Sequence, residues 1–389
     1  MIRAAGESFY KQSQQWFTWL HLKVLNAILR CRTAALGGHV DACSKCGHEV
    51  VSYNSCRNRH CPKCQANARD RWLAAREKEL LPTRYVHVVF TLPRQLSPLA
   101  MQNKREIYAL LFRASAAETL TEVAHDPKHL GAEIGFFSVL HTWNQKLQHH
   151  PHVHCVVPAG GLAPDHSRWI DSQQKFFLPV DVLKEVFRGK FVDGLKELHA
   201  EHKLGFHGTL AALQNPKAFA AWLRPLFRTK WVVYSKRPFG GAQHALRYLG
   251  QYTHRVAISN RRLVALADGI VTFRWRDSAH KNKKRLMALP VDEFLRRFLL
   301  HMLPPGFVRI RHFGFLAHRC HGTLLPLCFQ LLAESGRVPV ETSVEEENGS
   351  SSRPLWTCPR CGGPMVLIER LNYIELRLRS PPVPPAHQP

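Results

Sequence analysis

Apolar residues recur every three or four positions in two stretches near the start of the chain. The first runs from about residue 8 to residue 33 and predicts an amphipathic helix that ends before the glycine pair at 37–38. The second, residues 66–82, predicts a basic helix closed by Pro82. The chain therefore opens with helical elements.

The pattern then changes to short runs rich in β-branched and aromatic residues. Strands are predicted at 85–93, 136–143, 152–162, 231–236 and 270–277, and helices at 103–123 and 181–199. Strands interleaved with helices predict an α+β core over about residues 80–320. Beyond Glu334 the sequence is polar and rich in Ser, Glu and Pro, which indicates a linker, and the tail after residue 380 is proline-rich and expected to be disordered.

The charge balance narrows the choice of partner. Lys and Arg number 54 against 29 Asp and Glu, a formal net charge of +25 at pH 7. Such a surplus favours a polyanion, with nucleic acid as the first candidate and an anionic membrane surface as the alternative. We find no apolar run long enough to span a bilayer and no signal-peptide pattern, so we expect a soluble, cytoplasmic protein without a membrane partner.

Close cysteine pairs indicate metal ligation in a reducing compartment. Two CxxC pairs lie near the N-terminus, and their four thiolates would suit one tetrahedral structural zinc site: Cys43, Cys46, Cys61 and Cys64. Cys56 and His60 are near enough to substitute or to build a second site. Arg57 and Arg59, between the pairs, are expected to face outward, where they could touch phosphate.

A further CxxC pair, Cys358 and Cys361, has no partner pair nearby in the sequence. A complete zinc site there would need Cys320, Cys328 or His318, and the alternative is a metal-free turn. The chain is thus expected to divide into a helix plus zinc-binding domain (1–80), an α+β domain (81–330), a linker (331–356) and a CxxC fragment with a disordered tail (357–389).

The stretch HHPHVHCVV at 149–157 places imidazole beside an apolar strand. On a strand His152 and His154 project from the same face while Val153 points to the other, so the two imidazoles form half of a divalent metal site. Candidate additional ligands are His141, Gln145, His149 and His150. The alternative is a pair of surface histidines, and the spacing does not select the metal.

A second group of chemically useful residues lies at 246–255, LRYLGQYTHR. Tyr248 and Tyr252 are four residues apart and would share one face of a helix, either as core aromatics or as phenols presented to a phosphodiester. Cations surround them: Arg247, His254, Arg255, Arg261 and Arg262.

These motifs together resemble a known family. HPHVHCVVPAGGL is similar to the histidine-hydrophobic-histidine (HUH) motif of single-strand endonucleases, and YLGQY to the paired tyrosines of their two-tyrosine branch. SCRNRHCPKCQ resembles the zinc-binding domain that precedes this core in rolling-circle transposases of the insertion-sequence ninety-one family. FRGKF, FRWRD and the stretch at 293–319 are also similar to that family, so the resemblance covers about residues 10–325.

The resemblance implies an HUH-endonuclease-like core with an antiparallel sheet over residues 81–330. His152 and His154 would hold Mg²⁺ or Mn²⁺ on the scissile phosphate, and Tyr248 or Tyr252 would attack it to give a 5′-phosphotyrosine link and a free 3′-OH. It further implies a bacterial, nucleoid-associated enzyme that acts on single-stranded DNA at the element ends and target. A chain without a GxxxxGK[ST] loop is consistent with rejoining that needs no ATP.

Basic segments are expected to bind the DNA backbone. The residues are Arg57, Arg59, Arg247, Arg255, Arg261, Arg262, Lys281, Lys283, Lys284 and the RIRH stretch at 309–312. Trp231, Phe273 and Trp275 could stack on unpaired bases or belong to the core. Two rival functions remain: a zinc-dependent DNA-binding regulator without catalysis, and a plasmid replication initiator or relaxase with the same chemistry.

Overall fold

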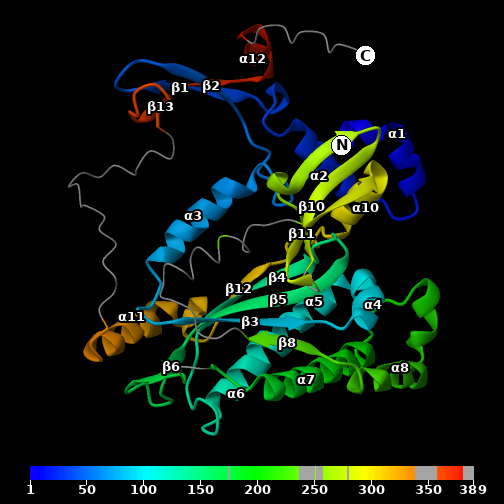
Figure 1. Ribbon diagram of the computed structural model, residues 1–389, viewed down its shortest axis with the longest axis vertical. Helices are drawn as coiled ribbons and strands as arrows, with labels where there is room; N and C mark the ends of the chain where they lie inside the picture. The colour runs from blue at the N-terminus through cyan, green and yellow to red at the C-terminus, as the bar shows by residue number, and fades with distance from the viewer. Residues whose placement is uncertain (174–175, 236–249, 251–256, 278–279, 338–356, 380–389) are drawn as a thin grey trace. The chain divides into compact units, whose positions relative to one another are not determined.

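The computed structural model describes residues 1–173, 176–235, 250, 257–277, 280–337 and 357–379. The chain divides into two compact units (Figure 1). One, here the terminal unit, combines Met1–Ala68 with Glu341–Pro389, and the other, the central unit, is Arg69–Val340. The CxxC fragment near the C-terminus was expected to stand apart from the N-terminal domain, and it instead belongs to the same unit.

The central unit is built on a five-stranded antiparallel sheet with the strand order β12-β4-β5-β3-β8. Its strands are β3 (Tyr85–Thr91), β4 (Phe136–Trp143), β5 (His149–Pro158), β8 (Val232–Ser235) and β12 (Ile310–Phe313). A separate three-stranded antiparallel sheet contains β9 (Leu263–Ala267), β10 (Ile270–Asp277) and β11 (Lys283–Pro290). A two-stranded sheet contains β6 (Gly160–Leu162) and β7 (Trp169–Asp171).

Helices precede, join and follow these strands along the chain. They are α3 (Gln65–Glu77), α4 (Ser97–Gln102), α5 (Lys104–Phe112), α6 (Thr121–His125), α7 (Val180–Ala200), α8 (Pro216–Leu223), α10 (Val291–Leu300) and α11 (His318–Glu334). Figure 1 shows α5 and α7 on one side of the five-stranded sheet. The α+β class and the antiparallel sheet predicted from the sequence are confirmed.

The two faces of this sheet have different environments because side chains alternate along each strand. One face contributes the main core: Phe90 of β3 and Val153 and Val157 of β5 are fully buried with the apolar side chains of α5 and α7. The other face carries Val139, Val156 and their apolar neighbours at one end, and histidines beyond them. The histidines therefore lie on strands whose opposite face is packed into the main core.

The terminal unit contains α1 (Ile2–Ser13), α2 (Trp19–Arg30), β1 (Gly38–Cys43), β2 (Glu49–Tyr53), β13 (Met365–Leu371) and α12 (Tyr373–Arg379). The single helix predicted over residues 8–33 was wrong, because the chain forms two helices. Thr18 has an extended backbone and caps α2 together with His21 in a reciprocal capping box, which ends one helix and starts the next.

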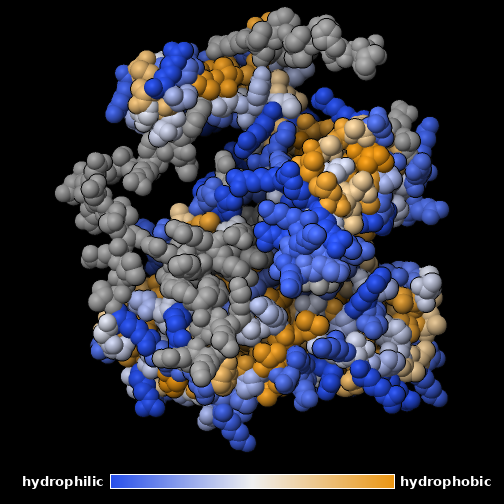
Figure 2. Space-filling view, in the orientation of Figure 1, coloured by the Kyte–Doolittle hydropathy of each residue, from blue (hydrophilic) through white to orange (hydrophobic). Residues whose placement is uncertain are grey.

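The sheet of β13, β1 and β2 has a very small hydrophobic core. Val40, Leu371 and Leu376 are buried. Apolar residues of the same strands remain at the surface (Figure 2), with Val51, Val366 and Ile368 each about half exposed. So little buried apolar area leaves this sheet dependent on another source of stability.

Candidate metal centres

Three histidines meet on the face of the five-stranded sheet away from the main core. His152 of β5 lies directly opposite His141 of β4, and His154 lies opposite Val139, two residues along. The ring centroids are 4.4 Å apart for His141 and His154 and 4.8 Å apart for His152 and His154. One nitrogen of each ring lies within 4.8 Å of the others, so the three can act as ligands of one ion.

Hydrogen bonds orient two of these rings. The Nδ1 of His152 lies 2.7 Å from the carbonyl oxygen of His150, so Nδ1–H donates and Nε2 keeps its lone pair. The Nδ1 of His154 lies 2.8 Å from Nε2 of His87 on β3. Donation of one ring N–H to a neighbouring acceptor fixes the tautomer and direction of a metal-binding histidine. No motif in the sequence indicates this role of His87.

Burial keeps the imidazoles of His152 and His154 neutral. It lowers the pKa of His152 to about 4, assisted by the nearby charge of His150. Burial and the proximity of His141 and His152 lower the pKa of His154 well below its ordinary value. Neutral imidazole is the form that binds a metal, so the donor set fits a divalent cation at neutral pH.

Other histidines and Gln145, considered as additional ligands, lie elsewhere. His149 faces the opposite side of β5, where Nε2 contacts the Tyr108 hydroxyl and Nδ1 the Ser97 hydroxyl, each at 2.8 Å. Gln145 is exposed in the turn between β4 and β5. His150 lies beside His152 but outside the three-histidine cluster. Among these candidates only His141 joins His152 and His154.

Tyr248 and Tyr252 lie outside the described residues, as do Arg247, His254 and Arg255. Another tyrosine, Tyr234 of β8, is on the same sheet face as the histidines, because it pairs with Val89, which pairs in turn with His154. Its side chain is 51% exposed. Tyr234 is therefore a third phenol to test beside Tyr248 and Tyr252.

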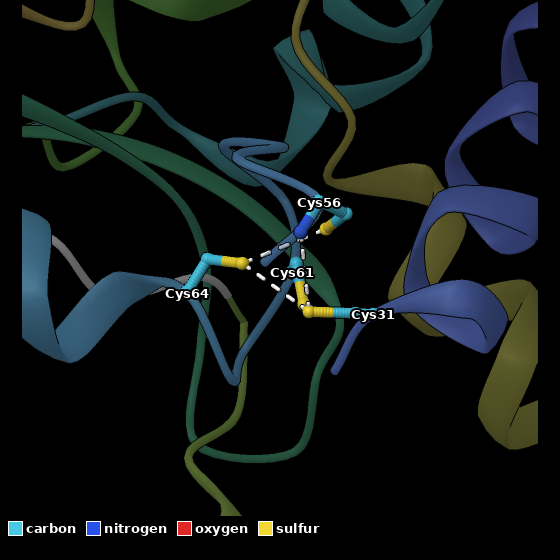
Figure 3. Close-up of side chains that lie close together, drawn as sticks. All are labelled: Cys31, Cys56, Cys61 and Cys64. Atoms are coloured by element: carbon cyan, nitrogen blue, oxygen red, sulfur yellow. Dashed lines mark hydrogen bonds between the residues drawn. The ribbon is translucent and has the colours of Figure 1, made fainter. Parts of the chain in front are cut away.

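The cysteines of the terminal unit form two clusters of four. In the first, the side chains of Cys31, Cys56, Cys61 and Cys64 point toward one another (Figure 3). The Sγ of Cys64 lies 3.4 Å from that of Cys31 and 3.5 Å from that of Cys56. In the second, Cys43 and Cys46 lie with Cys358 and Cys361. Four convergent sulfurs are the usual ligand set of a structural zinc ion.

The predicted grouping of Cys43, Cys46, Cys61 and Cys64 is thus split between two clusters. Cys43 and Cys46 flank the turn between β1 and β2, whereas Cys61 and Cys64 follow β2 and converge with the end of α2. Cys56, considered as a substitute ligand, belongs to the first cluster, and buried His60 belongs to neither. Cys31 was missed because it stands alone, 25 residues before the next cluster member, without a CxxC spacing.

The residues expected to bind DNA have mixed environments. Arg57, Arg59, Arg261, Lys281, Lys283 and Lys284 are exposed. The guanidinium of Arg262 packs over the Phe273 ring and donates to the carbonyl of Arg274, so it has a structural role. Trp231 and Phe273 are buried and Trp275 is partly buried, which places the first two in the core rather than on a base-stacking surface.

Comparisons with known proteins match two parts of the chain to family models. A family described as transposase zinc-binding domain matches residues 1–92, and one described as putative transposase matches residues 135–323. A putative transposase of Sinorhizobium fredii is 50% identical over 375 residues, covering 95% of this chain and 94% of its own length. The transposase for insertion sequence element IS801 of Pseudomonas savastanoi pv. phaseolicola is 29% identical, covering 92% and 86%. No solved structure matches.

A cysteine-rich N-terminal domain joined to this α+β body defines the chain as a DNA transposase with a structural zinc-binding domain. It belongs to the insertion-sequence ninety-one family of transposases. Transposases cut and join DNA. DNA is therefore the polyanionic partner that the net positive charge of the chain indicates. Within the described residues, every helix is too short or too polar to cross a membrane.

Proposed function

We propose that this transposase nicks and rejoins single-stranded DNA through a 5′-phosphotyrosine intermediate and so moves its insertion sequence by a rolling-circle route. The observation that carries the proposal is the cluster of His141, His152 and His154 on two adjacent strands. Its three imidazoles would supply the ligands of a divalent cation, Mg²⁺ or Mn²⁺, and the nucleophile would come from the tyrosine pair predicted from the sequence. His141 would be the third ligand.

The division of labour follows from the chemistry of each group. When bound, the cation polarises a non-bridging phosphate oxygen and stabilises the charge that develops on it. His87 holds the His154 ring in one tautomer, and stacking on Trp143 at a centroid distance of 4.6 Å holds the His141 ring. The exposed lysines of β11 bind flanking phosphates.

Tyr248 or Tyr252 supplies the nucleophile. Its oxygen loses a proton, forms a bond to phosphorus in line with the leaving 3′ oxygen, and the P–O3′ bond breaks. The released oxygen takes up a proton to become a 3′-OH. One phosphoester is exchanged for another, so a second 3′-OH can attack the phosphotyrosine and rejoin DNA without ATP. A phenol has a pKa of about 10, so the positive surroundings must favour its ionised form.

The polarity of the covalent link tests the proposal. The transposase would be incubated with Mn²⁺ and single-stranded oligonucleotides from the ends of its insertion sequence, labelled on either side of the nick. The label 3′ of the nick is expected to remain with the protein after denaturation, and the label 5′ of it to be released with a 3′-OH. Chelation by EDTA should abolish both products. Binding without any covalent product would instead favour the non-catalytic regulator.

Substitution of His87 is expected to weaken metal use without changing the nucleophile. His87→Leu removes the partner of His154 Nδ1 and should reduce the apparent affinity for Mn²⁺ in the nicking reaction by about 10- to 100-fold. His87→Gln keeps an amide oxygen that can accept from Nδ1–H and should restore part of it. The measurement is the nicking rate against Mn²⁺ concentration, with melting temperatures of both variants as the check on folding.

A purely structural role of His87 would give a different result. The two variants would then differ in melting temperature and amount of active protein but would need the same Mn²⁺ concentration for half-maximal rate. That outcome would contradict the positioning role.

A further inference from the structure

Two CxxC knuckles of the terminal unit, Cys43–Cys46 and Cys358–Cys361, have the same backbone structure although they lie 315 residues apart in the sequence. In both CxxC-Gly turns, a backbone N–H two residues after the first cysteine donates to its Sγ at 3.4 Å: Lys45 to Cys43 and Arg360 to Cys358. The glycines that follow, Gly47 and Gly362, have φ angles of +68° and +70°.

The main-chain hydrogen bonds of the two knuckles also correspond. Gly47 donates to the carbonyl of Cys43 at 3.0 Å, and Gly362 to that of Cys358 at 2.9 Å. The amide of each first cysteine then donates to the carbonyl five residues on, that of His48 at 3.0 Å and of Gly363 at 2.8 Å. N–H groups directed at sulfur stabilise thiolate, which is the form that binds a metal.

The four sulfurs of these knuckles converge. Cys361 Sγ lies 3.4 Å from the Sγ atoms of both Cys43 and Cys46, and Cys46 Sγ lies 3.7 Å from that of Cys358. These separations are far longer than a disulfide bond of about 2.05 Å. They fit four ligands around one ion, with one pair from each knuckle, as in zinc ribbons.

The rest of the C-terminal segment completes the same small sheet. β13 pairs with β1 in antiparallel register from Gly38 and Leu371 to Cys43 and Met365. A Cβ at Gly37 would lie 2.7 Å from the carbonyl oxygen of Leu371, and one at Gly38 would lie 3.0 Å from the Leu376 side chain. The glycine pair therefore permits the close approach of the C-terminal segment, whose Leu371 and Leu376 cover Val40.

We infer that Cys43, Cys46, Cys358 and Cys361 bind a second structural zinc ion, so that the zinc-binding unit is assembled from both ends of the chain. The C-terminal pair is then part of the N-terminal domain. Four thiolates select zinc over hard cations such as Mg²⁺. With its small core, the three-stranded sheet takes its stability from the ion, which joins two segments that are distant in the sequence.

Zinc content of the full-length protein tests this inference. The wild type is expected to bind two zinc ions per chain, measured by elemental analysis against protein concentration. Cys358→Ser with Cys361→Ser should bind one, and so should Cys31→Ser with Cys56→Ser. Cys320→Ser, a change of a cysteine outside both clusters, should still bind two. One zinc in the wild type, or two in the Cys358/Cys361 variant, would overturn the second site.

Thiol alkylation of the unmodified wild type gives an answer that does not depend on the folding of variants. Cys46 and Cys361 are exposed, and free thiols there would react readily with iodoacetamide. The second site predicts that they are protected in the zinc-loaded protein. After chelation, all four cysteines of the site should become modified together, as read by mass spectrometry. Rapid modification of Cys361 with zinc content unchanged would contradict the inference.

Discussion

Replacement of Tyr248 and Tyr252 together by phenylalanine is expected to abolish the covalent protein–DNA product, a loss of about 10⁴-fold or more. Phenylalanine preserves the ring but has no oxygen to attack phosphorus. Each single variant should still form one covalent link, because the other phenol remains. A single variant should, however, fail to join a second strand while its one remaining tyrosine is linked to the first DNA end. The measurement is the yield of covalent product on denaturing gels with labelled single-stranded DNA.

Two further tyrosines serve as controls for this experiment. Tyr234→Phe changes the exposed phenol on the histidine face, and Tyr373→Phe changes one in the terminal unit. Both variants should keep the covalent product, and peptide mapping should place the DNA on residue 248 or 252. Loss of the product in Tyr234→Phe, with an unchanged yield in the double variant, would assign the nucleophile to β8 instead.

Replacement of His152 and His154 together by alanine is expected to slow metal-dependent nicking by about 10³-fold or more. Two of three ligands are lost, and the cation supplies several kcal/mol of transition-state stabilisation, of which about 4 kcal/mol corresponds to a factor of 10³. His125→Ala, which changes an exposed histidine at the end of α6, should leave the rate unchanged. Nicking rates in Mg²⁺ and Mn²⁺ would be compared for all three proteins.

The affinity for single-stranded DNA separates a loss of metal from a loss of folding. Backbone binding comes from the lysines and arginines, so the histidine variant should keep its affinity and its dependence on salt. Its zinc content should also stay equal to that of the wild type. Retention of Mn²⁺-dependent nicking within tenfold of wild type would place the catalytic cation at another site.

Local sequence patterns predicted much of the central unit. The alternation in β3, β4, β5 and β10 is a property of each strand by itself, and the 3.6-residue spacing of α7 likewise needs no distant partner. The strands β9, β11 and β12 were not predicted. β11, with the sequence KKRLMALP, is charged at its start and exposed along most of its length, so its own composition does not predict a strand. Pairing with β10 makes it one.

The sequence by itself determined that His152 and His154 share a face, because two residues on one strand always do, and that closely spaced cysteines would bind metal. Only the tertiary structure decided which residues complete each site. The pairing of β4 with β5 brings His141 to the histidine cluster, and the pairing of β3 with β5 brings His87 beside it. The end of α2 brings Cys31 to the first cysteine cluster. Cys358 and Cys361 reach Cys43 and Cys46 through the pairing of β13 with β1. Such contacts depend on which segments of the chain pack together, and the spacing of residues along the sequence does not predict this packing.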